Sequence, residues 1–256
     1  MNALVIYIYL FLLGGCLGSF FGVLMDRIPK GESIITPGSY CVHCYTKVKI
    51  QHNIPMISYV VLKGRCKTCN TRIPFRYFLV EVVTALLLCV FYWLYGPSVL
   101  FIHVSMLMFF LVPISFIDFQ DWIVPDVITY PGILTGLMLN YGLAILPFYQ
   151  ALLGGFIGAG SFWLILKGYK LIRKKEGMGF GDVKLMGMIG VFLGPLSLAY
   201  VIFFSAVVGT LFGMVKMIKE GSNVQTMVPF GSCLTIGTVL FLLLSSKGFF
   251  VGFAVS

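Results

Sequence analysis

Long apolar runs alternate with short polar connections from one end of the chain to the other. A helix needs about 20 apolar residues to cross a hydrocarbon core of about 30 Å, and runs of roughly this length recur throughout. We therefore predict an all-α polytopic membrane protein with about eight transmembrane helices. The runs lie at about 3 to 25, 79 to 95, 99 to 117, 127 to 146, 148 to 166, 183 to 194, 196 to 215 and 228 to 246.

The sixth of these runs, at 183 to 194, is short for a membrane crossing. We expect it to extend past Gly194-Pro195, to tilt, or to lie inside the helix bundle away from lipid. The first run is long enough to be a retained span, and no small-residue cleavage site follows it, so we interpret it as a membrane helix and not as a cleaved signal peptide.

Composition strengthens the membrane interpretation and charge adds an orientation. The chain is 59% hydrophobic and 11% charged, with a mean hydropathy of +0.99, which excludes an ordinary soluble domain. Lys and Arg gather between Arg27 and Arg76 and between Lys167 and Lys184. The positive-inside rule then predicts an amino terminus outside and both basic segments in the cytoplasm, with only Lys247 near the outer face. We expect the lipid bilayer as a partner and no nucleic acid.

Residues 27 to 78 form the only long polar segment, and they contain two Cys-x-x-Cys pairs. The pairs are Cys41 with Cys44 and Cys66 with Cys69. Each pair can present two thiolates from a tight turn, and two turns complete the tetrahedral four-sulfur shell of a structural zinc site. We therefore predict structural zinc here, with His43 left in solvent.

A segment of about 50 residues has too little core to fold unaided, so a bound metal has an obvious structural role there. Two disulfides or free thiols are the alternatives, but stable disulfides are rare in a reducing cytoplasm. The predicted organisation is a first transmembrane helix at 1–26, a small cytoplasmic zinc-type domain at 27–78 and a membrane domain at 79–256.

Four aspartates stand where apolar runs meet the cytoplasmic side. Asp118, Asp121 and Asp126 follow the third run, and Asp182 opens the sixth. Two carboxylates brought close together share one proton, because both cannot ionise side by side. The charged member can take a proton from water while the neutral member donates one to a scissile carbonyl, which is aspartyl protease chemistry.

Plainer explanations exist for several of these aspartates. Asp121 or Asp126 can cap a helix that begins near Val127. An ion pair from Lys184 to Asp118 or Asp182 would explain those two.

Glycines at 177, 179 and 181 permit unusual backbone conformations and close approach of another chain, as an extended substrate requires.

A series of motifs runs in order along the chain: "GSFFGVLMDRIP" at 18 to 29, the two Cys-x-x-Cys pairs, "NIPMISY" at 53 to 59, "RYFLVE" at 76 to 81, "DFQDWIVPD" at 118 to 126 and "GFGD" at 179 to 182. This series resembles that of the bacterial type IV prepilin peptidases, which belong with the Gly-x-Gly-Asp membrane aspartyl proteases. The resemblance covers essentially the whole chain. It implies removal of the short basic leader of prepilins or pilin-like proteins, at the cytoplasmic face of the bacterial inner membrane, usually after a glycine.

By this resemblance Asp118 and Asp182 are the expected catalytic pair, and the four cysteines match the family's cytoplasmic zinc-type domain. The expected supporting residues are Asp126, Gly179, Gly181, Lys184 and Glu81, which follows the "RY" of the second span. Gly22 replaces a usual Asn, and Val42 replaces a usual Pro.

Many members of the family that the chain resembles also methylate the new amino terminus with S-adenosylmethionine. This second activity is implied by resemblance alone, because no Rossmann-type glycine fingerprint is present. The glycines at 14, 15 and 18 lie inside the first run, where close helix packing explains them.

Two alternatives come from other classes of protein. Intramembrane carboxylates and glycine-broken spans also build proton-coupled transporters, although no internal repeat is evident and the key aspartates lie at one face. A structural or assembly protein that uses the zinc loop for docking is the other. Neither alternative gives Asp118 and Asp182 a joint role.

Overall fold

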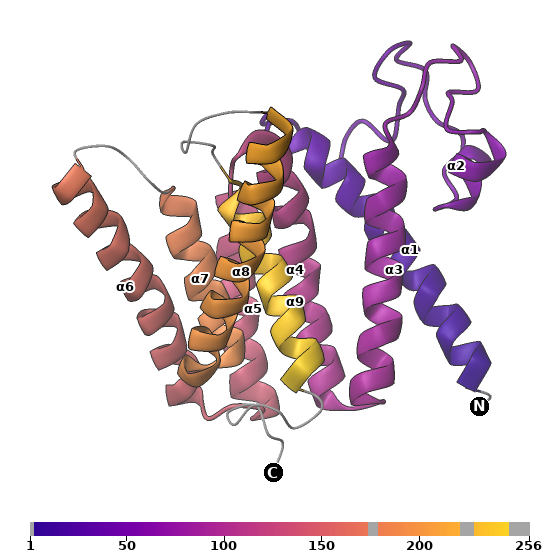
Figure 1. Ribbon diagram of the computed structural model, residues 1–256. Coiled ribbons are helices and arrows are strands. Elements are labelled where there is room, and N and C mark those ends of the chain that lie inside the picture. Colours follow the sequence, from indigo (N-terminus) through magenta and orange to yellow (C-terminus); the bar gives the residue numbers. More distant parts are fainter. Residues whose placement is uncertain (1–2, 174–178, 221–227, 246–256) are drawn as a thin grey trace. The chain divides into compact units, whose positions relative to one another are not determined.

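The computed structural model describes residues 3–173, 179–220 and 228–245 (Figure 1). Gly177 and Lys247, which entered the predictions above, lie outside the described residues. The backbone contacts divide the chain into two compact units, Met1–Trp93 and Leu94–Ser256. Within the described ranges the regular elements are all helices, which confirms the predicted all-α class. The division at 1–26, 27–78 and 79–256 stays a prediction.

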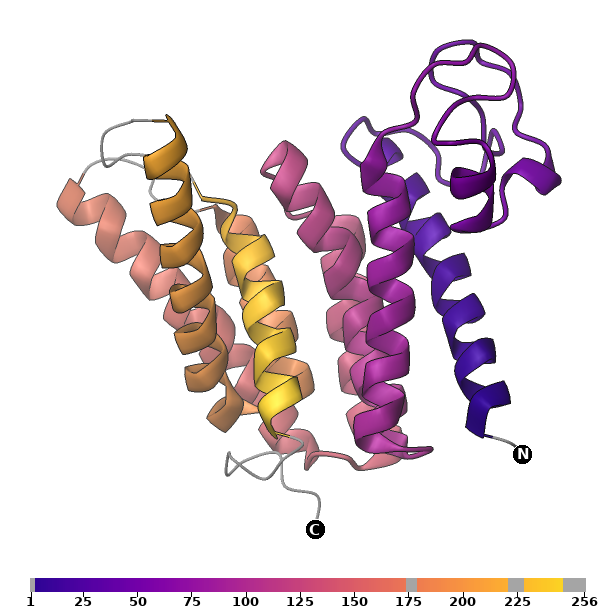
Figure 2. The same ribbon diagram turned by 45° about the vertical axis from the view of Figure 1, so that its right-hand side comes forward.

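The first unit is a pair of long helices with an irregular module between them in sequence. Helices α1 (Ala3–Arg27) and α3 (Phe75–Tyr95) run side by side, and the module carries the short helices η1 (Ile50–His52) and α2 (Ile57–Val61) (Figures 1 and 2). Isolated β-bridges close two turns of this module.

Glycines allow α1 and α3 to touch along their backbones. A Cβ atom added at Gly14 would lie 2.5 Å from the Ala85 Cα, and one added at Gly18 would lie 2.5 Å from the Glu81 Cα. Real Cβ atoms do not approach so closely, so only glycine fits at either place. This confirms close helix packing as the reason for Gly14 and Gly18, whereas a Cβ at Gly15 would meet the Met56 side chain of the module at 2.7 Å.

The described residues of the second unit form a bundle of six helices. Each predicted apolar run of this part of the chain is a helix, with ends that differ from the prediction by several residues. Their bounds are α4 Val99–Asp121, α5 Asp126–Leu143, α6 Phe148–Arg173, α7 Phe180–Leu193, α8 Pro195–Glu220 and α9 Phe230–Ser245.

Five helices of the described chain are long and apolar enough to cross a membrane, and they are α1, α3, α4, α6 and α8. Helix α9 is apolar but shorter. A multi-pass membrane protein is therefore confirmed, whereas the total of eight crossings and their orientation stay predictions.

Helix α7, the short sixth run, lies in the middle of the second unit and contacts α4, α5, α6, α8 and α9 (Figures 1 and 2). Its residues from Leu185 to Leu193 are all buried. Gly194 ends the helix with a φ of 76°, and α8 begins at the next residue. Of the three expectations for this run, burial inside the bundle is correct, and extension past Gly194-Pro195 is wrong because Gly194 adopts a left-handed conformation.

Facing glycines bring α6 and α7 into direct backbone contact. A Cβ at Gly154 would lie 2.1 Å from the Gly190 carbonyl oxygen, and one at Gly158 would lie 2.5 Å from the Met186 carbonyl oxygen. These small residues let α7 sit against α6 without side chains between the two backbones.

The carboxyl end of α7 is fixed by side chains from three other helices. His103 Nε2 lies 2.9 Å from the Phe192 carbonyl oxygen, and Asn140 Nδ2 donates to the Val191 carbonyl at 3.0 Å. Ser197 Oγ donates to the Leu193 carbonyl at 2.9 Å. The last carbonyls of a helix lack partners within it, so these bonds anchor the end of α7 that lies away from Asp182.

Candidate active site and metal cluster

Asp118 lies on the last turns of α4, where its carboxyl group meets the start of α9. Its side chain is buried, and the residue is only 5% exposed. The Asp118 Oδ2 atom accepts a hydrogen bond from the Ser232 backbone N–H at 2.7 Å and contacts the Ser232 hydroxyl at 3.1 Å. A buried charge is expensive without such donors, so this contact makes an ionised carboxylate tolerable at this position.

Asp182 is the third residue of α7 and is 7% exposed. Its backbone N–H donates to the Gly179 carbonyl oxygen at 3.2 Å. Asp118 acts electrostatically on the Asp182 carboxyl, and the Cys233 thiol is within electrostatic reach of both. The fold therefore brings together the two aspartates that the sequence analysis paired, from segments more than 60 residues apart.

Val124 lies between the two aspartate-bearing segments. A Cβ at Gly181 would lie 2.7 Å from the Val124 Cβ, and a Cβ at Gly231 would lie 3.3 Å from the Val124 Cγ2. The same Cβ at Gly231 would lie 3.0 Å from the Asp118 Cγ. Glycine at 181 and 231 thus lets the starts of α7 and α9 close around the α4–α5 connection.

The role expected for the glycine backbone needs a correction. Gly179 has φ −74° and ψ 146°, an extended conformation open to any residue. Gly181 is inside a regular helix and is needed for its close approach to Val124. Neither position has an unusual backbone conformation. Close packing requires glycine at 181, whereas a Cβ at Gly179 would meet no atom closer than 3.9 Å.

Gly231 and Ser232 were missed in the sequence analysis. Pro229 followed within three residues by a serine, at the start of an apolar run, is a helix-start pattern. This pattern predicts the first turn of α9, but it does not indicate that the turn lies against Asp118.

Lys184 pairs with Asp126, and not with Asp118 or Asp182 as the ion-pair alternative supposed. The ammonium group also lies 5.6 Å from the centre of the Tyr130 ring and 5.4 Å from that of Phe180. Lys184 points toward α5, whose first residue is Asp126, and this direction accounts for the choice of partner.

The capping alternative is wrong for both aspartates that it concerned. Pro125 is the N-cap of α5, and no side chain bonds to the free N–H groups there. Asp126 is the first helical residue, where a carboxylate favours the helix dipole without capping. Asp121 ends α4 and is exposed.

The four cysteines of the module converge on one point. Their Sγ atoms all lie within 4.8 Å of one another, with Cys41 to Cys69 at 3.8 Å and Cys44 to Cys66 at 4.0 Å. A tetrahedral zinc with Zn–S bonds of about 2.3 Å separates its sulfurs by about 3.8 Å. All seven cysteines are free thiols, so the disulfide alternative is wrong, and the cluster fits a tetrahedral metal ion. His43 is exposed and outside this set.

Both Cys-x-x-Cys turns have the same hydrogen bonding. The Cys41 N–H donates to the Thr46 carbonyl at 3.0 Å, and the Cys66 N–H donates to the Thr71 carbonyl at 2.9 Å. Hydrogen bonds with the Thr71 side chain and backbone lower the pKa of Cys69 to about 6. Thr46 likewise lowers the pKa of Cys44. Thiolates are the metal-binding form, so both turns favour a bound cation.

The crowding of four thiols has the opposite effect at Cys41. The Cys44 backbone amide favours its thiolate, but burial and hydrogen bonds shared with neighbouring thiols raise its pKa to about 11. A divalent cation would relieve this crowding by binding all four sulfurs as thiolates.

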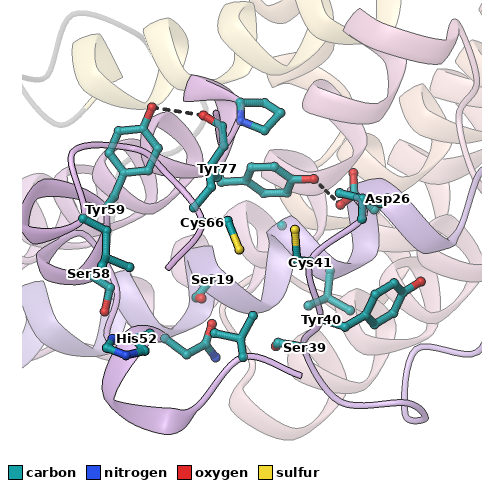
Figure 3. A pocket seen from close by; sticks show the side chains of 18 of the residues that line it. Ser19, Asp26, Ser39, Tyr40, Cys41, His52, Ser58, Tyr59, Cys66 and Tyr77 are labelled. Atoms are coloured by element: carbon teal, nitrogen blue, oxygen red, sulfur yellow. Dashed lines mark hydrogen bonds between the residues drawn. The ribbon is translucent and has the colours of Figure 1, made fainter. Parts of the chain in front are cut away.

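A cavity of about 530 Å³ opens in the first unit between the module and the adjoining ends of α1 and α3 (Figure 3). Tyr77 and Asp26 meet on its wall, where the Tyr77 hydroxyl donates to the Asp26 carboxylate, and Arg76 pairs with the same carboxylate at 2.8 Å. Ser19, Tyr59 and the thiols of Cys41 and Cys66 also line it (Figure 3). The volume is in the usual range for a small-molecule site.

Glu81 reaches this cavity from α3 and is 9% exposed. Its Oε2 atom accepts a hydrogen bond from the Met56 N–H at 2.6 Å, and the Ser19 hydroxyl is a second polar neighbour. Over the described ranges no Lys or Arg forms an ion pair with Glu81. A buried carboxylate on the wall of a cavity without a cationic partner can bind a cationic ligand.

The fold and the site define a class: a polytopic helical membrane protein with a buried pair of carboxylates and a separate four-thiol cluster. The family model described as Bacterial Peptidase A24 N-terminal domain matches residues 12–95, and the model described as Type IV leader peptidase family matches residues 105–214. No solved structure gives a significant match.

Three curated relatives are named prepilin leader peptidase/N-methyltransferase. The protein of Pseudomonas putida is 34% identical over 246 residues, which is 88% of this chain and 85% of the relative. That of Neisseria gonorrhoeae is 35% identical over 85% of this chain and 75% of its own length. That of Pseudomonas aeruginosa is 32% identical over 91% of this chain and 88% of its own length. The chain belongs to the type IV leader peptidase family, and it is a peptidase.

Proposed function

We propose that the chain is a membrane aspartyl endopeptidase that removes the short basic leader of type IV prepilins or pilin-like proteins. The proposal depends on one observation above all: Asp118 and Asp182 are both buried, lie on contacting helices and interact electrostatically. Among the described acidic residues only Glu81 is also buried, and it belongs to the first unit.

In the proposed mechanism the pair holds one proton between its two carboxyl groups. The ionised aspartate removes a proton from a water molecule, whose oxygen attacks the scissile carbonyl carbon. The neutral aspartate donates its proton to the carbonyl oxygen. Collapse of the intermediate then breaks the C–N bond. The leaving amine takes the proton that came from water, and a hydroxyl of the intermediate gives its proton to the other aspartate as the carbonyl re-forms, so the pair again holds one proton.

The orientation proposed from the charge distribution suits such a substrate. A short basic leader ahead of an apolar helix stays on the cytoplasmic side by the same rule that orients this chain. With the amino terminus outside, the connections that carry Asp118 and Asp182 also face the cytoplasm. The leader and the pair then meet at the same membrane face.

Substitution of either aspartate tests the peptidase. Asp118→Asn and Asp182→Asn each remove one half of the acid–base pair, and general acid or base groups contribute about 10²–10⁴-fold each. We expect each variant to lose cleavage by at least about a hundredfold, measured by mass spectrometry of prepilin incubated with the membrane-embedded protein. Asp121→Asn, which changes an exposed aspartate on the same helix, is the matched control and should cleave normally.

Retained cleavage in either dyad variant would overturn the aspartyl mechanism. A proton-coupled transporter predicts a different result, in which the unsubstituted chain leaves prepilin intact and the two substitutions abolish proton uptake by vesicles.

We infer a second activity, methylation of the new amino terminus, because the cavity beside Glu81 has a volume and a buried carboxylate that suit its cofactor. S-adenosylmethionine carries a sulfonium cation, and when bound it supplies the methyl group. Glu81 is placed to attract that cation, and the Tyr59 and Tyr77 rings offer flat surfaces to its adenine. Gly18 and Gly22 leave the α1 wall without bulk.

Binding measurements test this site independently of turnover. We expect Glu81→Gln to weaken equilibrium binding of S-adenosylmethionine about tenfold, which corresponds to about 1.4 kcal/mol. Binding of S-adenosylhomocysteine, which lacks the sulfonium charge, should change much less, and leader cleavage should persist. Equal loss for both ligands would contradict a charge-specific role for Glu81.

The four-thiol cluster is proposed as a structural zinc site. Its task is to fold the module that forms one side of the cavity, because this irregular segment contains few buried apolar residues.

A further inference from the structure

The two carboxyl groups of the proposed dyad differ in the hydrogen-bond donors that face them. Asp118 Oδ2 meets both the backbone N–H and the hydroxyl of Ser232, and the Gly231 amide faces the same carboxyl group. Asp182 is faced by the Gly179 amide alone among the described donors. Each donor stabilises a charged carboxylate more than a neutral one.

The start of α9 explains this concentration of donors. The first N–H groups of a helix have no acceptor within it and carry the positive end of the helix dipole. Ser232 is the third residue of α9, so its N–H is one of these groups. Gly231 has no side chain to keep the Asp118 carboxyl away.

The other titratable and charged groups near Asp118 do not reverse this difference. Asp182 approaches from α7, and a charge on either aspartate disfavours a charge on the other. The Cys233 thiol of α9 is within electrostatic reach of both aspartates and carries no charge as a thiol. Asp121 follows on α4 itself, and Lys184 of α7 is paired with Asp126 of α5. Over the described ranges, no ion pair joins Lys or Arg to either dyad carboxyl.

We propose that Ser232 is a positioning residue that fixes the shared proton of the dyad on Asp182 and leaves Asp118 charged. Asp118 is then the base that takes the proton of the attacking water, and Asp182 is the acid that donates to the substrate carbonyl. This inference rests on the proposed peptidase function.

The pH profile of kcat/KM for leader cleavage distinguishes the two assignments. Its acidic limb reports the first ionisation of the dyad, and its alkaline limb reports loss of the second proton. If Asp118 ionises first, loss of a hydrogen-bond donor to Asp118 moves only the acidic limb. The second ionisation is then that of Asp182, and Asp118 is charged both before and after it. If Asp182 ionises first, the same change moves only the alkaline limb.

Two substitutions remove the donors stepwise. Ser232→Ala removes the hydroxyl, whose single proton is shared with the Ser115 carbonyl at 2.7 Å, so we expect the acidic limb to move up by about half a pH unit. Ser232→Pro also removes the N–H, and proline is tolerated in the first turn of a helix, so the shift should reach about one unit.

Two further variants complete the experiment. Ser232→Thr keeps both donors and should restore the original profile. Thr235→Ala removes a hydroxyl one turn along the same helix, where it bonds to the Gly231 carbonyl at 3.1 Å, and it should leave both limbs in place. Should Ser232→Ala fail to insert, Ser232→Cys replaces it, since a thiol is a much weaker donor of similar shape.

Movement of the alkaline limb would place the proton on Asp118 and overturn the assignment, and unchanged limbs in both Ser232→Ala and Ser232→Pro would overturn the role of Ser232. Failure of the proposed function gives separate results: survival of cleavage in Asp118→Asn or Asp182→Asn overturns the aspartyl mechanism, and intact prepilin with the unsubstituted chain overturns the peptidase.

Discussion

A methyl group added to Gly154 tests whether the backbones of α6 and α7 are in direct contact. The Cβ of Gly154→Ala would lie 2.1 Å from the Gly190 carbonyl oxygen, whereas close C···O contacts are about 3.3 Å or longer. The missing distance is about 1.2 Å. Neither partner is a flexible side chain, so α6 must move away from α7 as a body.

This movement would also loosen the neighbouring contact between Gly158 and Met186. Overpacking of a tight interior costs about 1–3 kcal/mol, and two rigid backbones place Gly154→Ala at the upper end. Replacing a helical glycine by alanine raises the free energy of unfolding by about 0.5–1 kcal/mol. We therefore expect a net loss of about 2 kcal/mol.

Gly160→Ala is the matched control on the same helix, because a Cβ at Gly160 meets no atom within 4 Å. It should leave stability unchanged or raise it by up to about 1 kcal/mol. Unfolding of each purified variant by denaturant in mixed micelles, followed by circular dichroism, measures the difference. Equal unfolding midpoints for Gly154→Ala and Gly160→Ala would refute direct backbone contact between α6 and α7.

Two other substitutions test the metal cluster and the ion pair. Cys66→Ser should lower bound zinc, measured by elemental analysis, because one of four ligands is lost, and it should make the module between α1 and α3 more sensitive to protease. Stoichiometric zinc in a protein without all four thiols would contradict the site. Asp126→Asn should cost at most about 1 kcal/mol and less than tenfold in leader cleavage, because the partner of Lys184 is half exposed. A thermal unfolding scan and a cleavage assay check this, and complete loss of cleavage would show that Asp126 does more than support the site.

The helices could be predicted from the sequence, because apolar runs are local along the chain, and Asp118 and Asp182 stand out as candidates for the same reason. Their joint catalytic role is expected from the predicted topology and the family resemblance, and it stays a prediction. Apolar runs bounded by charges predict helices, and a carboxylate at the end of an apolar run stands out by its cost. The spacing of the four cysteines is equally local, and the fold brings their sulfurs together.

The partner of Lys184 could not be predicted, since it depends on which of three nearby carboxylates the packing of α5 against α7 presents. The contact of Ser232 with Asp118 could not be predicted either, because nothing in the sequence around Ser232 points to Asp118. The cavity beside Glu81 has walls from α1, α3 and the module, and no single segment shows it.

The shortness of α7 has a consequence for how water would reach the proposed hydrolytic site. Fourteen helical residues span about 21 Å, less than the hydrocarbon thickness of about 30 Å. In the proposed orientation the end fixed by His103, Asn140 and Ser197, which continues directly into α8, lies at the outer surface, and this leaves the shortfall at the Asp182 end. The proposed hydrolysis would then proceed in a wet recess below the membrane surface, and the peptide bond need not be lifted out of the membrane to meet its nucleophile.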